Sequence, residues 1–197
     1  MLCLACARPR SPLCWDCEIG LRPAPPRTEH GLTVYPAFAH HGTGVSLVHN
    51  VKYRRSLPAA RLLADEMARR VPVEAQVLVP IPRVLARRVA YGIDQTAVLA
   101  SLIAEIIGVR VVECLSVPMW QRRLAGSSRI RRKSPSFHVK RATNGVVLVD
   151  DVITTGTTLI AAASVLGRAN VIAAVTATSA GRQQRSGVGS PKSEAEA

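Results

Sequence analysis

The segment from Val146 to Thr158 constrains the fold of this chain more than any other, because it predicts a strand, a turn and a helix in succession. Four apolar residues, Val146 to Val149, come first, and two acidic residues, Asp150 and Asp151, follow them directly. Short apolar runs of this kind are typical of strands buried in a parallel sheet. We therefore expect a buried strand whose carboxyl end carries polar groups.

The turn after this strand combines one glycine with four hydroxyl side chains and opens a predicted helix over 157–168. Its residues are Thr154, Thr155, Gly156, Thr157 and Thr158. The glycine lets backbone amides approach a ligand closely, and the hydroxyls add donors to the positive end of the helix. The turn therefore predicts a phosphate-binding site made of these five residues.

The two acidic residues suit a different partner. Asp150 and Asp151 would repel a phosphate, so their natural partners are sugar hydroxyls, a metal ion or positive charge that develops during a reaction. A purely structural turn with a threonine cap is the alternative, although one cap requires neither four threonines nor two aspartates.

Three other phosphate motifs do not fit this segment. A Walker loop requires a lysine after its second glycine, and none follows Gly156. The GxGxxG fingerprint of dinucleotide-binding folds is absent. An aspartyl phosphatase would place a second acid two positions after its nucleophile, where this chain has Val152.

The rest of the chain predicts two strand-helix-strand units and hence an α/β fold with an open, mainly parallel sheet flanked by helices. The first unit has a strand over Gln76–Pro82, a helix from Asp94 to Ile107 and a strand over Val109–Val112. The second has the strand from Val146, the helix over 157–168 and a strand over Val171–Thr178.

Two helices and an edge strand are expected ahead of these units. Thr33 to Phe38 predicts a short edge strand, and Leu47, Val48 and Val51 mark the apolar face of a helix. Pro58 suits the first turn of a second helix, which we expect to run towards Arg70.

Four cysteines near the N-terminus form two CxxC pairs, Cys3 with Cys6 and Cys14 with Cys17. Each pair can place two thiolates on one metal from a tight turn, so the pattern predicts a small structural zinc knuckle. Reduced thiols without a metal, or a redox pair, are the alternatives. The fifth cysteine, Cys114, follows an apolar run and is expected in the core.

Composition then suggests where the parts of the chain divide. Three prolines between Arg22 and Arg27 predict a stiff connection rather than a regular helix. We expect a zinc knuckle over 1–26, a linker and edge segment over 27–45, the α/β domain over 46–180 and a disordered tail over 181–197.

The chain is strongly basic, with a formal net charge of +13. This charge implies attraction to an anionic partner, either nucleic acid or phosphorylated small molecules, unless it only keeps the surface soluble. No acidic residue occurs between Cys114 and Val149, where Arg122 and Arg123 begin a basic run that we expect to be mobile. The N-terminus has no apolar segment of a signal peptide, so we expect a cytoplasmic protein without membrane insertion.

The strand, the paired acids and the TTG-type turn resemble the phosphoribosyl-diphosphate-binding signature of type I phosphoribosyltransferases. Together with the cysteine knuckle, three more segments resemble the ComF/GntX family of competence-associated proteins. These are Val51–Tyr53, Val79–Pro82 with the arginines that follow, and Gly92–Gln95. The family usually has Arg-Gly-aromatic-Asn-Gln where this chain has Tyr91-Gly-Ile-Asp-Gln95, so the arginine and the asparagine are missing.

The resemblance implies a transferase that binds 5-phosphoribosyl 1-diphosphate with Mg²⁺ and transfers phosphoribose to an acceptor that the sequence does not identify. Asp150 and Asp151 would hold the ribose hydroxyls and stabilise positive charge in the transition state, and Thr154 to Thr158 would hold the 5′-phosphate. Arg83, Arg122 and Arg123 would lie near the diphosphate. The alternative is a competence-type factor that handles single-stranded DNA and uses the fold as a scaffold.

Overall fold

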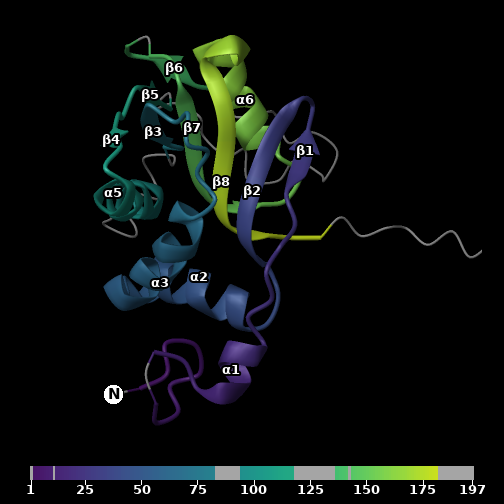
Figure 1. Cartoon of the computed structure of the whole chain (residues 1–197), viewed down its shortest axis with the longest axis vertical. Helices are drawn as coiled ribbons and strands as arrows, with labels where there is room; N and C mark the ends of the chain where they lie inside the picture. Colours follow the sequence, from purple (N-terminus) through teal and green to yellow (C-terminus); the bar gives the residue numbers. More distant parts are fainter. Residues whose placement is uncertain (1, 11, 83–93, 118–135, 142, 182–197) are drawn as a thin grey trace, which may run out of the picture.

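The computed structural model describes residues 2–10, 12–82, 94–117, 136–141 and 143–181. Its centre is a six-stranded sheet in the order β1-β2-β8-β7-β3-β4 (Figure 1). The strands are β1 (Arg27–Glu29), β2 (Leu32–Ala39), β3 (Val77–Pro80), β4 (Arg110–Val111), β7 (Val146–Ile153) and β8 (Val171–Ser179). β1 and β2 pair antiparallel, and all other neighbours pair parallel. The predicted mainly parallel α/β sheet is confirmed.

Helices cover both faces of this sheet (Figure 1). One face packs against α2 (Thr43–Arg54), α3 (Leu57–Ala68) and α5 (Gln95–Ile107). The other packs against α6 (Thr157–Leu166), which the short 3-10 helix η1 (Arg168–Asn170) follows. A separate antiparallel pair, β5 (Leu115–Ser116) with β6 (His138–Val139), lies beside the sheet, and α1 (Trp15–Ile19) belongs to the N-terminal segment.

The continuous apolar run of β7 follows from its central position. Val147 and Val149 are buried on the face covered by α2, α3 and α5, whereas Val146 and Leu148 are buried on the face covered by α6. Successive side chains of a strand point to opposite faces, so both sets must be apolar when both faces are covered.

The predicted helices occur with bounds close to those expected, and local signals explain their ends. Ser56 caps α3 by accepting a hydrogen bond from the Ala59 amide at 3.3 Å. Gly108 ends α5 in the left-handed conformation, with φ of 72°. Asp94 stands at the N-cap of α5, but its carboxylate accepts from the Thr96 hydroxyl at 2.6 Å instead of capping a backbone amide.

Two details differ from the sequence-based expectation. The strand predicted over Thr33–Phe38 is not an edge strand, because β1 covers one side of β2 while β8 pairs with the other. The helix predicted over 157–168 ends at Leu166, since Gly167 with φ of 84° breaks it and η1 follows.

The N-terminal segment packs onto the helical layer below the sheet in Figure 1. Cys3, Leu13, Cys14 and Cys17 belong to the same buried cluster as α2, α3 and α5. The side-chain amide of Asn50 in α2 donates to the backbone carbonyl of Leu4. The segment therefore shares a hydrophobic core with the main sheet.

Some of the expectations lie outside the described residues. They are the part of the expected basic run that lies within 118–135, including Arg122 and Arg123, and the predicted tail apart from its first residue, Gly181. Within the described part of the chain, no helix has the length and apolar character needed to span a membrane.

Candidate functional site

The candidate site lies where β7 extends past its neighbour β3. The last residue pair between these strands joins Val149 to Pro80, whereas β7 continues to Ile153 and pairs with β8 alone. Asp150 and Asp151 occupy the part of β7 that extends beyond β3. Ligands of open parallel sheets bind at the carboxyl ends of the strands, so the two carboxylates stand where a site is expected.

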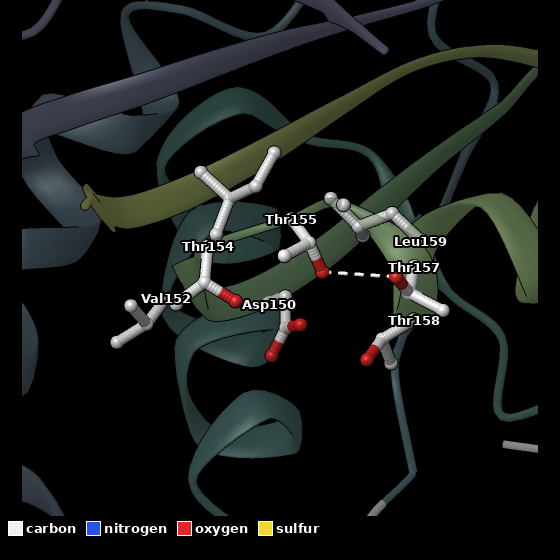
Figure 2. Close-up of a pocket in the computed structure, with 9 residues that line it drawn as sticks. Asp150, Val152, Thr154, Thr155, Thr157, Thr158 and Leu159 are labelled. Carbon is white, nitrogen blue, oxygen red and sulfur yellow. Dashed lines mark hydrogen bonds between the residues drawn. The ribbon is translucent and has the colours of Figure 1, made fainter. Parts of the chain in front are cut away.

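A hollow of about 220 Å³, open to solvent, lies between the end of β7 and the start of α6. Asp150 and all five residues predicted to bind phosphate line it, namely Thr154, Thr155, Gly156, Thr157 and Thr158. Figure 2 shows the Asp150 carboxylate together with the threonine hydroxyls, and a 2.9 Å hydrogen bond joins the hydroxyls of Thr155 and Thr157. The structure thus brings one carboxylate together with the whole turn over 154–158, which we call the threonine turn.

Gly156 shapes the threonine turn through its backbone conformation. It is the N-cap of α6 and has φ of 74°, which side-chain-bearing residues rarely adopt. A Cβ atom at this position would also lie 3.0 Å from Cγ of Glu29 and 3.2 Å from its Cβ. The first turn of α6 contains no acidic residue, so no side chain of that turn opposes an anion at the helix end.

Glu29 itself was not predicted from the sequence. Its side chain is 3% exposed and pairs with Arg27, whose guanidinium also donates to the Ser179 hydroxyl and the Ala180 carbonyl, both at 3.2 Å. β1 therefore contacts the threonine turn through Glu29 and the end of β8 through Arg27. Arg27 and Glu29 are two positions apart in a strand, so their side chains lie on the same face of the sheet. This spacing of opposite charges is the sequence signal from which their ion pair could have been predicted.

Asp151 does not line the hollow. Its carboxylate is buried and forms a 2.9 Å ion pair with the ammonium group of Lys52 in α2. The backbone amide of Asp151 donates to the Asp150 carboxylate at 2.8 Å. The two aspartates, adjacent in the chain, thus have different surroundings.

A second, shallow hollow, too narrow to hold a water molecule, lies between β7, α2 and α5. Lys52, Asp151 and Gln95 contribute its polar groups, and aliphatic side chains form the rest. The side-chain amide of Gln95 donates to the Lys52 carbonyl at 3.4 Å. Among the described side chains, Gln95 Oε1 is the buried polar atom that has no hydrogen-bond partner.

Lys52 was another residue without a predicted role, although the sequence contains a signal for it. It follows Val48 by four positions, and Val48 is on the buried stripe of α2. Residues four apart share a face of a helix. A lysine on that stripe indicates a buried anionic partner, because an unpaired buried charge is costly.

The four predicted metal ligands, Cys3, Cys6, Cys14 and Cys17, come together as expected. Their sulfur atoms all lie within 4.8 Å of one another. A tetrahedral zinc ion with Zn–S bonds of ~2.3 Å places its ligand atoms about 3.8 Å apart, so the cluster fits such an ion with small adjustments. The cluster can therefore hold a metal ion.

Hydrogen bonds favour the thiolate form of Cys3 and Cys6, two of the four cysteines. Burial alone would raise the pKa of Cys3, but hydrogen bonds from backbone amides, including that of Cys14 at 3.3 Å, outweigh it and lower the pKa to about 6. The backbone amide and the guanidinium of Arg8 lower the pKa of Cys6. Burial and the neighbouring thiols raise the pKa of Cys17 to about 12, which a cation at the centre of the cluster would counteract.

The remaining predicted positions divide into two groups. Cys114 is buried in the core on the α6 face, as predicted, and burial raises the pKa of its thiol. Arg83, Arg122 and Arg123, expected near a diphosphate, lie outside the described residues.

Comparison with solved structures finds distant similarity. Two similar solved structures are adenine phosphoribosyltransferases, one from Leishmania donovani and one from Leishmania tarentolae. They show 13% and 10% identity, TM-scores of 0.41 and 0.40, and coverage of 66% and 64% of this chain. The chain spans 56% of the first protein and 73% of the second. A search among curated proteins found no match.

The family model for the phosphoribosyl transferase domain matches residues 54–191. This range covers most of the chain and includes β7, the threonine turn and α6. The chain therefore belongs to the phosphoribosyl transferase domain family.

Proposed function

We propose that this protein binds 5-phosphoribosyl 1-diphosphate and transfers its phosphoribosyl group to an acceptor. The observation that carries the proposal is the hollow that joins the Asp150 carboxylate to the threonine turn at the start of α6. The match to the phosphoribosyl transferase domain supports the same reaction class.

In this proposal the 5′-phosphate binds over Thr154 to Thr158, where backbone amides, hydroxyls and the helix dipole all favour an anion. The carboxylates of Asp150 and Asp151 would hold the ribose hydroxyls and stabilise the positive charge that develops at the anomeric carbon. A nucleophile attacks that carbon as the bond to the diphosphate breaks. Neither aspartate forms a covalent bond.

The diphosphate needs cations from elsewhere. We assign this role to Arg83, Arg122 and Arg123, together with a magnesium ion that enters with the substrate. Among the described residues, the cysteine cluster is the group of three or more His, Cys, Asp or Glu side chains that lie close enough to hold a metal ion. Mg²⁺ bound through substrate oxygens and few protein groups is usual, and it would neutralise the leaving group.

We assign zinc to the four-cysteine cluster. A four-thiolate zinc site is coordinatively closed and cannot activate water, so this ion would be structural. The cluster ahead of the transferase domain also supports membership of the narrower ComF/GntX group.

The first experiment is calorimetric titration of the zinc-loaded protein with phosphoribosyl diphosphate and Mg²⁺. We expect saturable binding that the Asp150→Asn, Asp151→Asn double variant loses. Asp65→Asn with Glu74→Gln removes the same charge from exposed positions and should bind as the wild type does. Binding that persists in the aspartate variant would contradict the site assignment.

A second candidate function follows from the net charge of +13. Under this alternative the fold is a scaffold for single-stranded nucleic acid, as in a competence factor. Contacts to phosphates alone would weaken steeply as salt concentration rises. Absence of sugar-diphosphate binding, together with salt-sensitive oligonucleotide binding, would favour this candidate over the transferase.

A further inference from the structure

The proposed function alone does not explain why Asp151 forms an ion pair with Lys52. The two side chains are 20% and 9% exposed, and the charged atoms lie 2.9 Å apart. A carboxylate buried to this degree is costly unless a cation compensates it. Lys52 therefore compensates the negative charge of Asp151 at this buried position.

The alternation along β7 separates the two carboxylates. Val147 and Val149 face the layer that contains α2, and Asp151 continues that set by pairing with α2. Asp150 lies on the other side, with Leu159 of α6 and the threonine turn. A substrate in the hollow would meet Asp150 directly, whereas Asp151 does not line the hollow.

One hydrogen bond connects the two carboxylates. The Asp151 amide donates to Asp150 Oδ1 at 2.8 Å, so the residue whose side chain pairs with Lys52 also orients the carboxylate in the hollow through its backbone. One oxygen of the Asp150 carboxylate thus accepts a hydrogen bond from within the protein.

Lys52 is itself fixed by its surroundings. Val48 and Val51 of the same helix are buried beside it, and Gln95, the first residue of α5, donates to its carbonyl at 3.4 Å. The ammonium group thus reaches Asp151 from a packed helix rather than from a loose surface chain.

We infer that Lys52 is a positioning residue of the sugar-phosphate site. It keeps Asp151 ionised and in place, and through the Asp151 amide it orients Asp150 towards the ribose of the bound substrate. This inference rests on the proposed function and assigns unequal roles to the two aspartates: Asp150 contacts the sugar, and Asp151 acts through Asp150 and through its charge.

The test is a double-mutant cycle with Lys52→Met, Asp151→Asn and the combination of both, each titrated with phosphoribosyl diphosphate and Mg²⁺. We expect Lys52→Met to weaken binding by about tenfold in the wild-type background, because a buried carboxylate loses its cation. In the Asp151→Asn background the same change should alter binding by less than about twofold, because the charge it compensates is gone. Arg54→Met, which removes one positive charge from an exposed position of α2, should leave the affinity unchanged.

Thermal denaturation of each variant separates positioning from folding. If Lys52→Met lowers the melting temperature but binds the substrate as tightly as the wild type does, the pair is structural and the inference is wrong. If Lys52→Met weakens binding equally in both backgrounds, Lys52 contacts the ligand itself and the inference is also wrong. Failure of the wild-type protein to bind the substrate would overturn the proposed function, and the inference with it.

Discussion

At the scale of single residues, the site depends on which charges are compensated and by what. Two buried carboxylates, Glu29 and Asp151, lie close to the threonine turn, and each has its own cation, Arg27 or Lys52. The carboxylate that lines the hollow, Asp150, is only partly buried and can still meet a ligand. Compensation of the buried charges keeps them from repelling a phosphate nearby.

His40 provides a pH-dependent prediction at this scale. Burial, followed by the positive charges of Lys52 and His49, lowers the pKa of His40 below 6.5, and its Nδ1 lies 2.8 Å from the Thr178 hydroxyl. The unfolded chain therefore binds a proton more readily than the folded protein does. The His40 contribution to stability is complete above pH 6.5 and is lost as the pH falls towards the lowered pKa.

The measurement is the melting temperature at about pH 7.5 and about pH 5.5. We expect His40→Asn, which keeps a polar group near Thr178, to lose less stability on acidification than the wild type. The same change at the exposed neighbour His41 is the control. An equal loss in the His40→Asn variant and the wild type would show that His40 is not the group responsible.

At the scale of elements, the start of α6 is held by a strand distant in the sequence. Gly156 needs its left-handed backbone and also has no room for a side chain beside Glu29 of β1. Gly108, at the end of α5, has a similar φ of 72° but no atom within 4 Å of a built Cβ. A comparison of substitutions at the two glycines therefore separates the effect of backbone strain from that of steric crowding.

We expect Gly108→Ala to destabilise the protein by about 1 to 2 kcal/mol through strain alone. Gly156→Ala should cost more, because Glu29 must also move, and it should weaken binding of phosphoribosyl diphosphate. Denaturant unfolding of both variants, with titration of the substrate, measures the two effects. Equal destabilisation by both substitutions would mean that the contact with Glu29 contributes nothing.

At the scale of the whole molecule, the cysteine cluster and the sheet share one core. Cys3, Cys14 and Cys17 are buried in the cluster that also contains α2 and α3. Metal binding to the folded state should therefore stabilise the entire chain and not the N-terminal segment alone.

Metal removal tests this coupling. We expect a chelator to lower the melting temperature of the single main transition seen by calorimetry, whereas chelator already saturated with zinc should not. Cys14→Ser should have the same effect and should lose the bound zinc by elemental analysis. A main transition unchanged by metal removal would show that the N-terminal segment folds independently.

The sequence by itself determined the parts of this protein whose signals are local. The strand from Val146, the acids after it and the turn over 154–158 form one continuous segment, and strand period, glycine and hydroxyl content identify each part. The spacing of the cysteines likewise predicted their cluster. These features depend on neighbouring residues, so a linear pattern records them.

Only the tertiary structure decided which distant side chains meet. Lys52 reaches Asp151 because α2 packs on the face of β7 that Asp151 shares, and Glu29 meets Gly156 because β1 folds over the start of α6. The edge position predicted for β2 was wrong because β1, a strand of three residues close by in the sequence, covers its other side. The pairing of β2 with β8, by contrast, joins the two ends of the domain. Such contacts arise from the packing of elements far apart in the chain, for which a single sequence contains no periodic signal.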